Sequence, residues 1–149
     1  MNYSVVQIPP NHYVWMELHS PNRVTRDFVA IGAVGTSTVE KCEICGGMHP
    51  PIKGMVGYSD WTKNRCIMHF ALVSPSAARS LREPAFKYVF EQAGRKYVLG
   101  YLRSDDKFRR GLARKLGFEE IYTLKDDVED GVDMILLRYT REQWEKRHV

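Results

Sequence analysis

Several features that would place a chain in a specialised class are missing from this sequence. No apolar run approaches the ~20 residues that a membrane-spanning helix needs, so we expect no membrane partner. The first ten residues lack a basic segment followed by an apolar run, which predicts no secretory signal and a cytoplasmic location. Cysteine is scarce, and an odd count of three argues against a disulfide framework. Repeats, low-complexity tracts and long linkers are also absent.

The composition is that of an ordinary globular protein. The 149 residues are 44% hydrophobic and 27% charged, which is enough for one domain with a buried core, spanning residues 1–149. The formal net charge is only +4. Basic residues gather most densely at positions 107–115, a pattern that suits nucleic acid, the phosphates of a nucleotide cofactor, or a solvated helix face.

The first half of the chain is expected to form four strands and one short helix. Alternating or β-branched residues mark the strands, and Asn11 is a suitable N-cap for the helix. The strands are expected at residues 3–8, 28–39, 54–59 and 66–73, the helix at 12–19, and a Cys-, Gly- and Pro-rich turn at 42–53.

The second half is expected to alternate helices and strands. A helix from Ser76, with Pro84 in the first turn of its main part, ends near Gly94. A strand at 96–102 leads to a basic helix that ends at Gly117, and a hairpin follows at 119–124 and 132–139. A last helix at 141–149 has Thr140 as its N-cap. The order β-α-β-β-β-α-β-α-β-β predicts a layered α/β (α+β) fold.

One local motif gives this order a family resemblance. Lys115-Leu116-Gly117-Phe118, at the end of the basic helix, resembles the motif that closes the fourth helix of GCN5-related N-acetyltransferases (GNAT). Residues 54–74 are similar to short acetyltransferase-like proteins of phages, and the whole likeness spans about residues 30–140. It implies a mixed, mostly antiparallel central sheet of six or seven strands flanked by helices.

The resemblance also implies how acetyl-CoA or another acyl-CoA would bind. The strands at 66–73 and 96–102 would splay apart, and the backbone near Phe70 and Leu72 would face the cofactor arm. The following helix would offer its N-terminus to the pyrophosphate. In that loop the family's Gln or Arg and its two small residues are replaced by Ser74, Ala77 and Arg79, so phosphate contacts from Arg79 and Arg82 would have to compensate.

Two kinds of residue are candidates for catalysis. His69 on the central strand has an ordinary pKa of about 6.5 that suits a general base, although a hydrogen-bonded core histidine fits the position equally well. Ser104 and Asp105 follow the next strand, where the resemblance places a site, and Asp105 or Asp106 equally suits a helix cap. The tyrosine that protonates the leaving thiolate in many relatives is replaced by Ala113.

The cysteines suggest a metal site. Cys42 and Cys45 have the C-x-x-C-G spacing of a zinc knuckle, and His49 is close enough to be a third ligand. Cys66 is the expected fourth ligand, because His69, three residues along the same strand, would face the opposite side. The alternative is a plain turn with reduced thiols or a redox pair.

Three functions fit these observations. The first is acyl-CoA-dependent transfer to an unknown amine, either a small molecule or a macromolecule. The second is a phage-type nucleobase-modifying enzyme resembling the Mom family, with DNA bound by the basic helix at 107–115. The third is a catalytically degenerate phage accessory, virion or host-interaction protein. A phage-encoded chain would act in the host cytoplasm.

Overall fold

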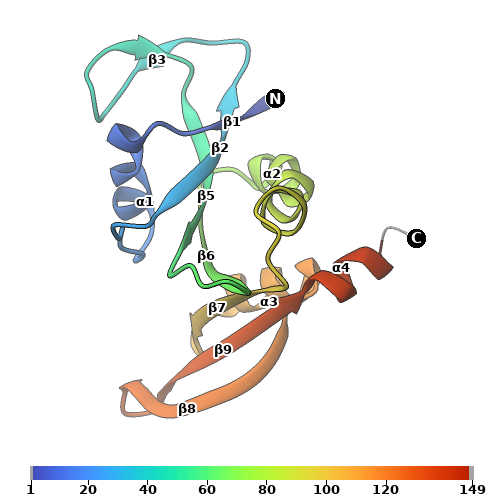
Figure 1. Ribbon diagram of the computed structural model, residues 1–149. Coiled ribbons are helices and arrows are strands. Elements are labelled where there is room, and N and C mark those ends of the chain that lie inside the picture. The colour runs from blue at the N-terminus through green and yellow to red at the C-terminus, as the bar shows by residue number, and fades with distance from the viewer. Residues whose placement is uncertain (1, 148–149) are drawn as a thin grey trace.

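A computed structural model describes residues 2–147, and its central element is a seven-stranded sheet (Figure 1). The strand order is β1-β2-β5-β6-β7-β9-β8, and every neighbouring pair is antiparallel except β6 and β7. The bounds are β1 (Tyr3–Gln7), β2 (Val29–Gly35), β5 (Ile52–Ser59), β6 (Arg65–Leu72), β7 (Tyr97–Arg103), β8 (Glu119–Glu129) and β9 (Val132–Thr140). A separate two-stranded sheet contains β3 (Glu40–Lys41) and β4 (Met48–His49).

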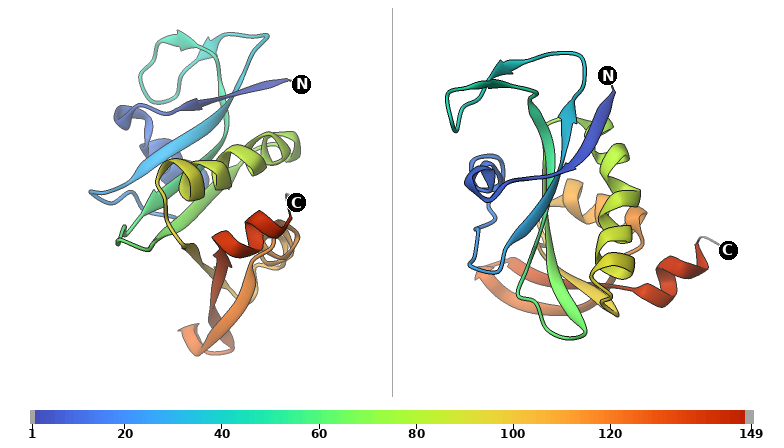
Figure 2. Two further views of the ribbon diagram at one scale, coloured as in Figure 1. Left: turned by 45° about the vertical axis from the view of Figure 1, so that its right-hand side comes forward. Right: turned by 45° about the horizontal axis from the view of Figure 1, so that its top comes forward.

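Helices cover both faces of the sheet (Figure 2). A short 3₁₀ turn, η1 (Pro10–His12), leads into α1 (Val14–His19) on one face. On the other face lies α2 (Pro75–Lys87), which continues as the π-helical segment η2 (Tyr88–Gln92). The chain then adds α3 (Lys107–Leu116) after β7 and α4 (Arg141–Lys146) after β9.

The core is divided by the sheet into two clusters of buried side chains. The larger one joins α2 and η2 to the sheet through residues such as Leu81, Phe90, Tyr58 and Tyr139. The smaller one lies under α1 and contains Ile8, Trp15, Met16, Phe28 and Met55. Since successive side chains of a strand point to opposite faces, the alternating apolar residues of the central strands supply both clusters.

The expected α/β (α+β) class and element order are confirmed, with a short hairpin added, whose strand β3 precedes the Cys-rich segment and whose strand β4 lies within it. The expectation for Pro84 is wrong. The helix begins at Pro75, where a missing N–H costs no hydrogen bond, and Pro84 lies in its interior. Gly117 ends α3 with a left-handed φ of 113°, as a C-terminal glycine should.

The C-terminal helix begins as expected. Thr140 is its N-cap, and Thr140 and Gln143 form a reciprocal capping box. The helix ends at Lys146, and residues 148–149 of the expected range lie outside the described residues. Within residues 2–147, none of the helices combines the length and the apolar character needed to cross a bilayer.

Candidate functional site

The sheet splits between its two parallel strands. β6 and β7 pair only at Arg65↔Tyr97, Cys66↔Val98 and Ile67↔Leu99. Beyond that point β6 stays paired with β5, and β7 stays paired with β9, so each strand follows its outer neighbour and the two separate. The expected divergence of these strands is therefore confirmed.

Strand alternation identifies which backbone groups face the gap. The carbonyl of Asn64 accepts hydrogen bonds from Lys96 N (2.7 Å) and Tyr97 N (3.2 Å), so even-numbered residues of β6 direct their N–H and C=O groups toward β7. Phe70 and Leu72 share this parity and lie beyond the last β6–β7 pair. Their peptide groups consequently border the gap, as the resemblance implied.

A cavity of about 300 Å³ occupies the gap. Its walls come from β6, β7, α3, the β8–β9 hairpin and the segment after α1, and they are mainly apolar. The polar side chains that line it are Asn22, His69, Tyr101, Arg103, Asp106 and Arg109. A mostly apolar cleft with a few convergent polar groups is the usual form of a small-molecule site.

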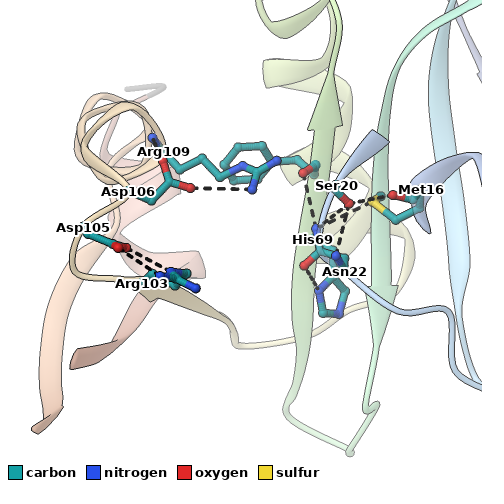
Figure 3. A network of polar contacts seen from close by, with 9 residues as sticks. Met16, Ser20, Asn22, His69, Arg103, Asp105, Asp106 and Arg109 are labelled. Atoms are coloured by element: carbon teal, nitrogen blue, oxygen red, sulfur yellow. Dashed lines mark hydrogen bonds and ion pairs between the residues drawn. The ribbon is translucent and has the colours of Figure 1, made fainter. Parts of the chain in front are cut away.

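His69 is held at this cavity from two sides. Its Nε2 lies 2.7 Å from Ser59 Oγ, and the Ser59 hydroxyl donates to Asp60 Oδ2 at 2.8 Å. Its Nδ1 lies 3.3 Å from Asn22 Oδ1. Asn22 is itself fixed, because its amide group donates to Ser20 Oγ at 3.1 Å and to Phe70 O at 3.5 Å. Figure 3 shows Asn22 and Ser20 approaching His69 from the segment after α1.

These contacts admit two neutral tautomers of His69. With the proton on Nε2, the ring donates to Ser59 Oγ, the Ser59 hydroxyl donates to Asp60, and Nδ1 carries the lone pair beside Asn22 Oδ1. With the proton on Nδ1, the ring donates to Asn22 Oδ1 and accepts the Ser59 hydroxyl at Nε2. Burial lowers the pKa of His69 below its usual 6.5, against the opposing charges of Asp60 and Asp27. The ring is therefore uncharged at neutral pH in either tautomer.

α3 contributes one cation to the cavity. Asp106 caps the helix, with its Oδ1 accepting from Arg109 N at 3.1 Å. Its other oxygen lies 3.6 Å from Arg109 Nη1. The guanidinium also lies over the Phe70 ring, 5.9 Å from its centre, and thus bridges from α3 toward β6 (Figure 3).

Two expected catalytic residues have other partners. Ser104 joins β7 to β9: its N–H donates to Asp133 O at 2.9 Å and its Oγ accepts from Asp133 N at 2.8 Å. Asp105 forms a two-pronged ion pair with Arg103, with both contacts at 2.9 Å (Figure 3). Neither residue lines the cavity, whereas the neighbouring Asp106 does.

The start of α2 differs from a glycine-rich phosphate loop in its side chains. Tyr3 OH donates to Ser74 Oγ at 3.0 Å, and Ser74 Oγ lies 2.8 Å from Ser76 Oγ. Ala77 is fully buried, and its Cβ would lie 3.1 Å from a Cβ built on Gly54, so its methyl group packs on the sheet. The loss of a glycine at position 77 therefore leaves the solvent side of this turn open.

The two arginines expected to assist the loop are exposed on α2. Arg82 reaches α3, where its Nη2 lies 3.5 Å from Lys115 O. It also borders a second, smaller cavity of about 40 Å³ between α2 and α3, which shares Met68 and Phe70 with the main cavity. The two cavities are therefore adjacent, on either side of Met68 and Phe70.

Much of the positive charge on α3 is neutralised within the protein. Arg110 and Arg114 both contact Glu120, and Arg109 pairs with Asp106. A helix whose arginines already have carboxylate partners offers less charge to a polyanion than its sequence suggests.

The expected metal ligands separate into two places. Cys42, Cys45 and His49 lie together, and their fourth neighbour is His12, with all ligand atoms within 4.8 Å of one another. Cys66, expected as the fourth ligand, is instead buried in the core on β6, where burial raises the pKa of its thiol to about 12. Cys66 is outside this group because its strand is central to the sheet.

Sequence reasoning missed several residues that the fold brings to these sites. Asn22 and Tyr101 line the cavity from segments with no motif, and only their contacts reveal them. Arg109 was hidden within a run of basic residues. His12 precedes the knuckle by 30 positions, and the one signal for it was that a C-x-x-C-x₃-H segment lacks a fourth ligand.

The same fold occurs in N-acetyltransferases of known structure. Spermidine/spermine N-acetyltransferase SpeG from Vibrio cholerae, solved with manganese ions, has a TM-score of 0.75 at 9% identity, over 99% of this chain and 98% of that chain. An acetyltransferase described as a GNAT family member, from Desulfovibrio desulfuricans, has a TM-score of 0.68 at 11% identity, over 93% and 98%. At such identities the likeness shows the fold alone, and it confirms the GNAT-like fold class. Neither a protein-family model nor a curated protein matches the sequence.

Proposed function

We propose that this protein is an N-acetyltransferase that transfers an acyl group from acetyl-CoA to an amine. The observation that carries the proposal is the split between β6 and β7, which leaves a cavity bordered by a neutral histidine and by β6 peptide groups that do not pair with β7. The GNAT-like fold of the whole chain supports it.

The residues present fit acetyl-CoA. The peptide groups of Phe70 and Leu72 would bind the amide-rich arm of the cofactor, because they border the gap beyond the last β6–β7 pair. Arg82, which borders the smaller cavity between α2 and α3, and Arg109, which borders the main cavity, would attract its phosphates. The bound cofactor supplies an activated acyl thioester.

His69 would take the proton from the attacking amine. In the tautomer with the proton on Nε2, the lone pair at Nδ1 lies 3.3 Å from the Asn22 carbonyl oxygen. An ammonium or amine placed there donates to both atoms, which relieves the contact between two acceptors. Proton transfer to Nδ1 then leaves the amine nitrogen free to attack, and the charged ring donates through Nε2 to Ser59.

Tyr101 would supply the proton for the departing thiolate. Ala113 lines the cavity with a methyl group where many relatives have a tyrosine, and so offers no proton. Tyr101 on β7 has the one hydroxyl among the cavity-lining side chains of residues 2–147. Alternate residues of β7 direct their peptide groups toward β9 and toward β6, and Tyr101 is one of the residues whose peptide groups face β6. Tyr101 therefore borders the gap between the two strands.

Calorimetric titration with acetyl-CoA tests the binding step, and release of free CoA in the presence of an amine panel tests transfer. The panel includes spermidine, spermine and a lysine-containing peptide, because the V. cholerae neighbour is a spermidine/spermine N-acetyltransferase. Binding at micromolar concentration with amine-dependent CoA release supports the proposal. No binding up to millimolar acetyl-CoA overturns it.

A further inference from the structure

A second group of reactive side chains lies outside the cavity. His12 of η1 meets Cys42, Cys45 and His49 of the segment that forms the β3–β4 hairpin. Their ligand atoms lie within 4.8 Å of one another. A tetrahedron with Zn–N of about 2.0–2.1 Å and Zn–S of about 2.3 Å has edges of roughly 3.3–3.8 Å, so a small inward movement would close the group around one ion.

Both histidines are oriented for metal binding. The Nδ1 of His12 lies 3.0 Å from Asn11 Oδ1, and the Nδ1 of His49 lies 2.9 Å from Pro50 O. Because these oxygens only accept, each Nδ1 carries the proton and each Nε2 carries the lone pair. Both Nε2 atoms are buried; within residues 2–147 that of His12 has no hydrogen-bond partner, and His49 has the Cys42 thiol beside it. A buried lone pair without a donor is costly unless a cation meets it.

The cysteine turn presents its sulfurs in the manner of a metal knuckle. Gly46 N donates to Cys42 O at 3.0 Å, and Cys42 N donates to Gly47 O at 2.8 Å, which closes a tight loop. Gly46 takes a left-handed φ of 75°, a conformation that favours glycine. The N–H of Ile44 points at Cys42 Sγ, 3.3 Å away, and such a donor stabilises negative charge on sulfur.

We propose that His12, Cys42, Cys45 and His49 bind one zinc ion in a closed structural site. Two thiolates with two imidazoles are a ligand set that zinc prefers, whereas calcium, magnesium and manganese prefer oxygen. Four protein ligands leave no open position for a substrate, so the ion does not take part in acyl transfer.

The zinc site links short elements that bury too little apolar surface to be stable alone. η1 has three residues, and β3 and β4 have two each, so they bury little apolar surface. The ion joins the start of α1 to the hairpin, and His19 Nε2, 2.5 Å from Glu43 Oε1, joins its end. Asn22, which contacts His69, lies three residues after the end of α1. By holding α1 against the hairpin, zinc thereby stabilises the position of Asn22 in the cavity wall.

Metal analysis of the untagged, reduced protein tests the proposal. We expect one zinc per chain, and we expect the His12→Gln variant and the Cys42→Ser/Cys45→Ser double variant to lose most of it. The matched control is Cys66→Ala, which removes the third cysteine and should keep one zinc. Zinc retained by His12→Gln, or lost by Cys66→Ala, would overturn this ligand set.

A measurement on the unaltered chain covers the case in which a variant does not fold. Zinc is removed with a chelator and cobalt(II) is added. Intense visible absorption of a tetrahedral ion, with sulfur-to-cobalt charge transfer from two thiolates, is the expected result. Weak octahedral absorption, or a Cys42–Cys45 disulfide found by mass analysis of the freshly purified protein, would contradict it. Chelation should also lower the melting temperature, and zinc should restore it.

Discussion

The Nε2 of His69 and the Oγ of Ser59 lie 2.7 Å apart, and the Ser59 hydroxyl passes the contact on to Asp60. With the proton on Nε2, this arrangement places the lone pair of His69 on Nδ1, beside Asn22 and the cavity. Two strands contribute the pair: Ser59 ends β5, and His69 lies within β6. The Ser59–His69 contact is therefore made within the sheet, and the Asn22 contact comes from the segment after α1.

Replacing His69 with Gln should lower kcat by about 10²–10⁴-fold, because the proton acceptor for the amine is removed. Affinity for acetyl-CoA, measured by calorimetry, should change little, since the histidine meets the amine. A loss of cofactor binding with unchanged kcat would contradict the base assignment.

The same histidine predicts a pH dependence of stability. Burial lowers the pKa of His69, so below about pH 6.5 the unfolded chain takes up a proton that the folded protein does not. The contribution of the neutral, buried His69 to stability is fully present above the pKa that His69 has in the unfolded chain. It is lost as pH falls through the lower pKa that His69 has in the folded protein. Urea unfolding should therefore show a shallower fall in stability below pH 6.5 for His69→Gln than for the parent protein.

Replacing Tyr101 with Phe isolates the second proposed proton transfer. Tyr101 is 46% exposed, so losing its hydroxyl should leave the melting temperature unchanged. kcat should fall about 10²-fold or more, while acetyl-CoA affinity stays constant. If kcat is unchanged and product release is shown not to limit the rate, the proton reaches the thiolate from another donor.

Arg109 and Arg110 are neighbours with different surroundings. Arg109 lines the cavity, whereas Arg110 forms a two-pronged pair with Glu120. Arg109→Ala should weaken acetyl-CoA binding by about 10- to 150-fold, as expected for a charged contact worth roughly 1.5–3 kcal/mol, and should make binding less salt-dependent. Arg110→Ala is the control and should leave affinity unchanged. If both variants weaken acetyl-CoA binding equally, the overall positive charge of α3 and not a contact of Arg109 determines the affinity.

Local sequence signals predicted the helices and strands better than the candidate functional sites. Short apolar runs identified β6 and β7, and Gly117 and Thr140 marked helix ends, because each signal acts through its immediate neighbours. Pro84 misled because proline in a helix interior is disfavoured by local propensity, while packing of α2 on the sheet tolerates it here.

The sites depended on contacts between distant segments. His12 reaches the cysteines only because the segment between β2 and β5, which carries the β3–β4 hairpin, brings them to η1. Asn22 and His69 are 47 positions apart, and nothing local to either predicts their contact. Cys66 has a side chain that can bind a metal, but its central strand buries it in the core, away from the other cysteines.

Burial of Cys66 makes a prediction for alkaline pH. The pKa of its thiol rises from 9.0 to about 12 in the folded protein, so the unfolded chain loses this proton first. The contribution of the Cys66 thiol to the free energy of unfolding is fully present below pH 9 and is lost as pH rises toward 12. The Cys66→Ala variant should show a shallower loss above pH 9, measured by denaturant unfolding. At pH 8 a thiol reagent should modify Cys66 only after unfolding.

Two glycines should respond oppositely to alanine. A Cβ on Gly57 would lie 2.0 Å from Cζ of Phe28, whose ring stacks on His69 with centres 6.3 Å apart. Gly57→Ala must displace that ring within a packed core, and we expect a loss of at least about 2–3 kcal/mol, measured by urea unfolding. A Cβ on Gly111, inside α3, meets nothing within 4 Å. Gly111→Ala should therefore stabilise by about 0.5–1 kcal/mol through helix propensity alone. Stabilisation by both changes would mean that Phe28 is free to move, and that the wall behind His69 is not rigid.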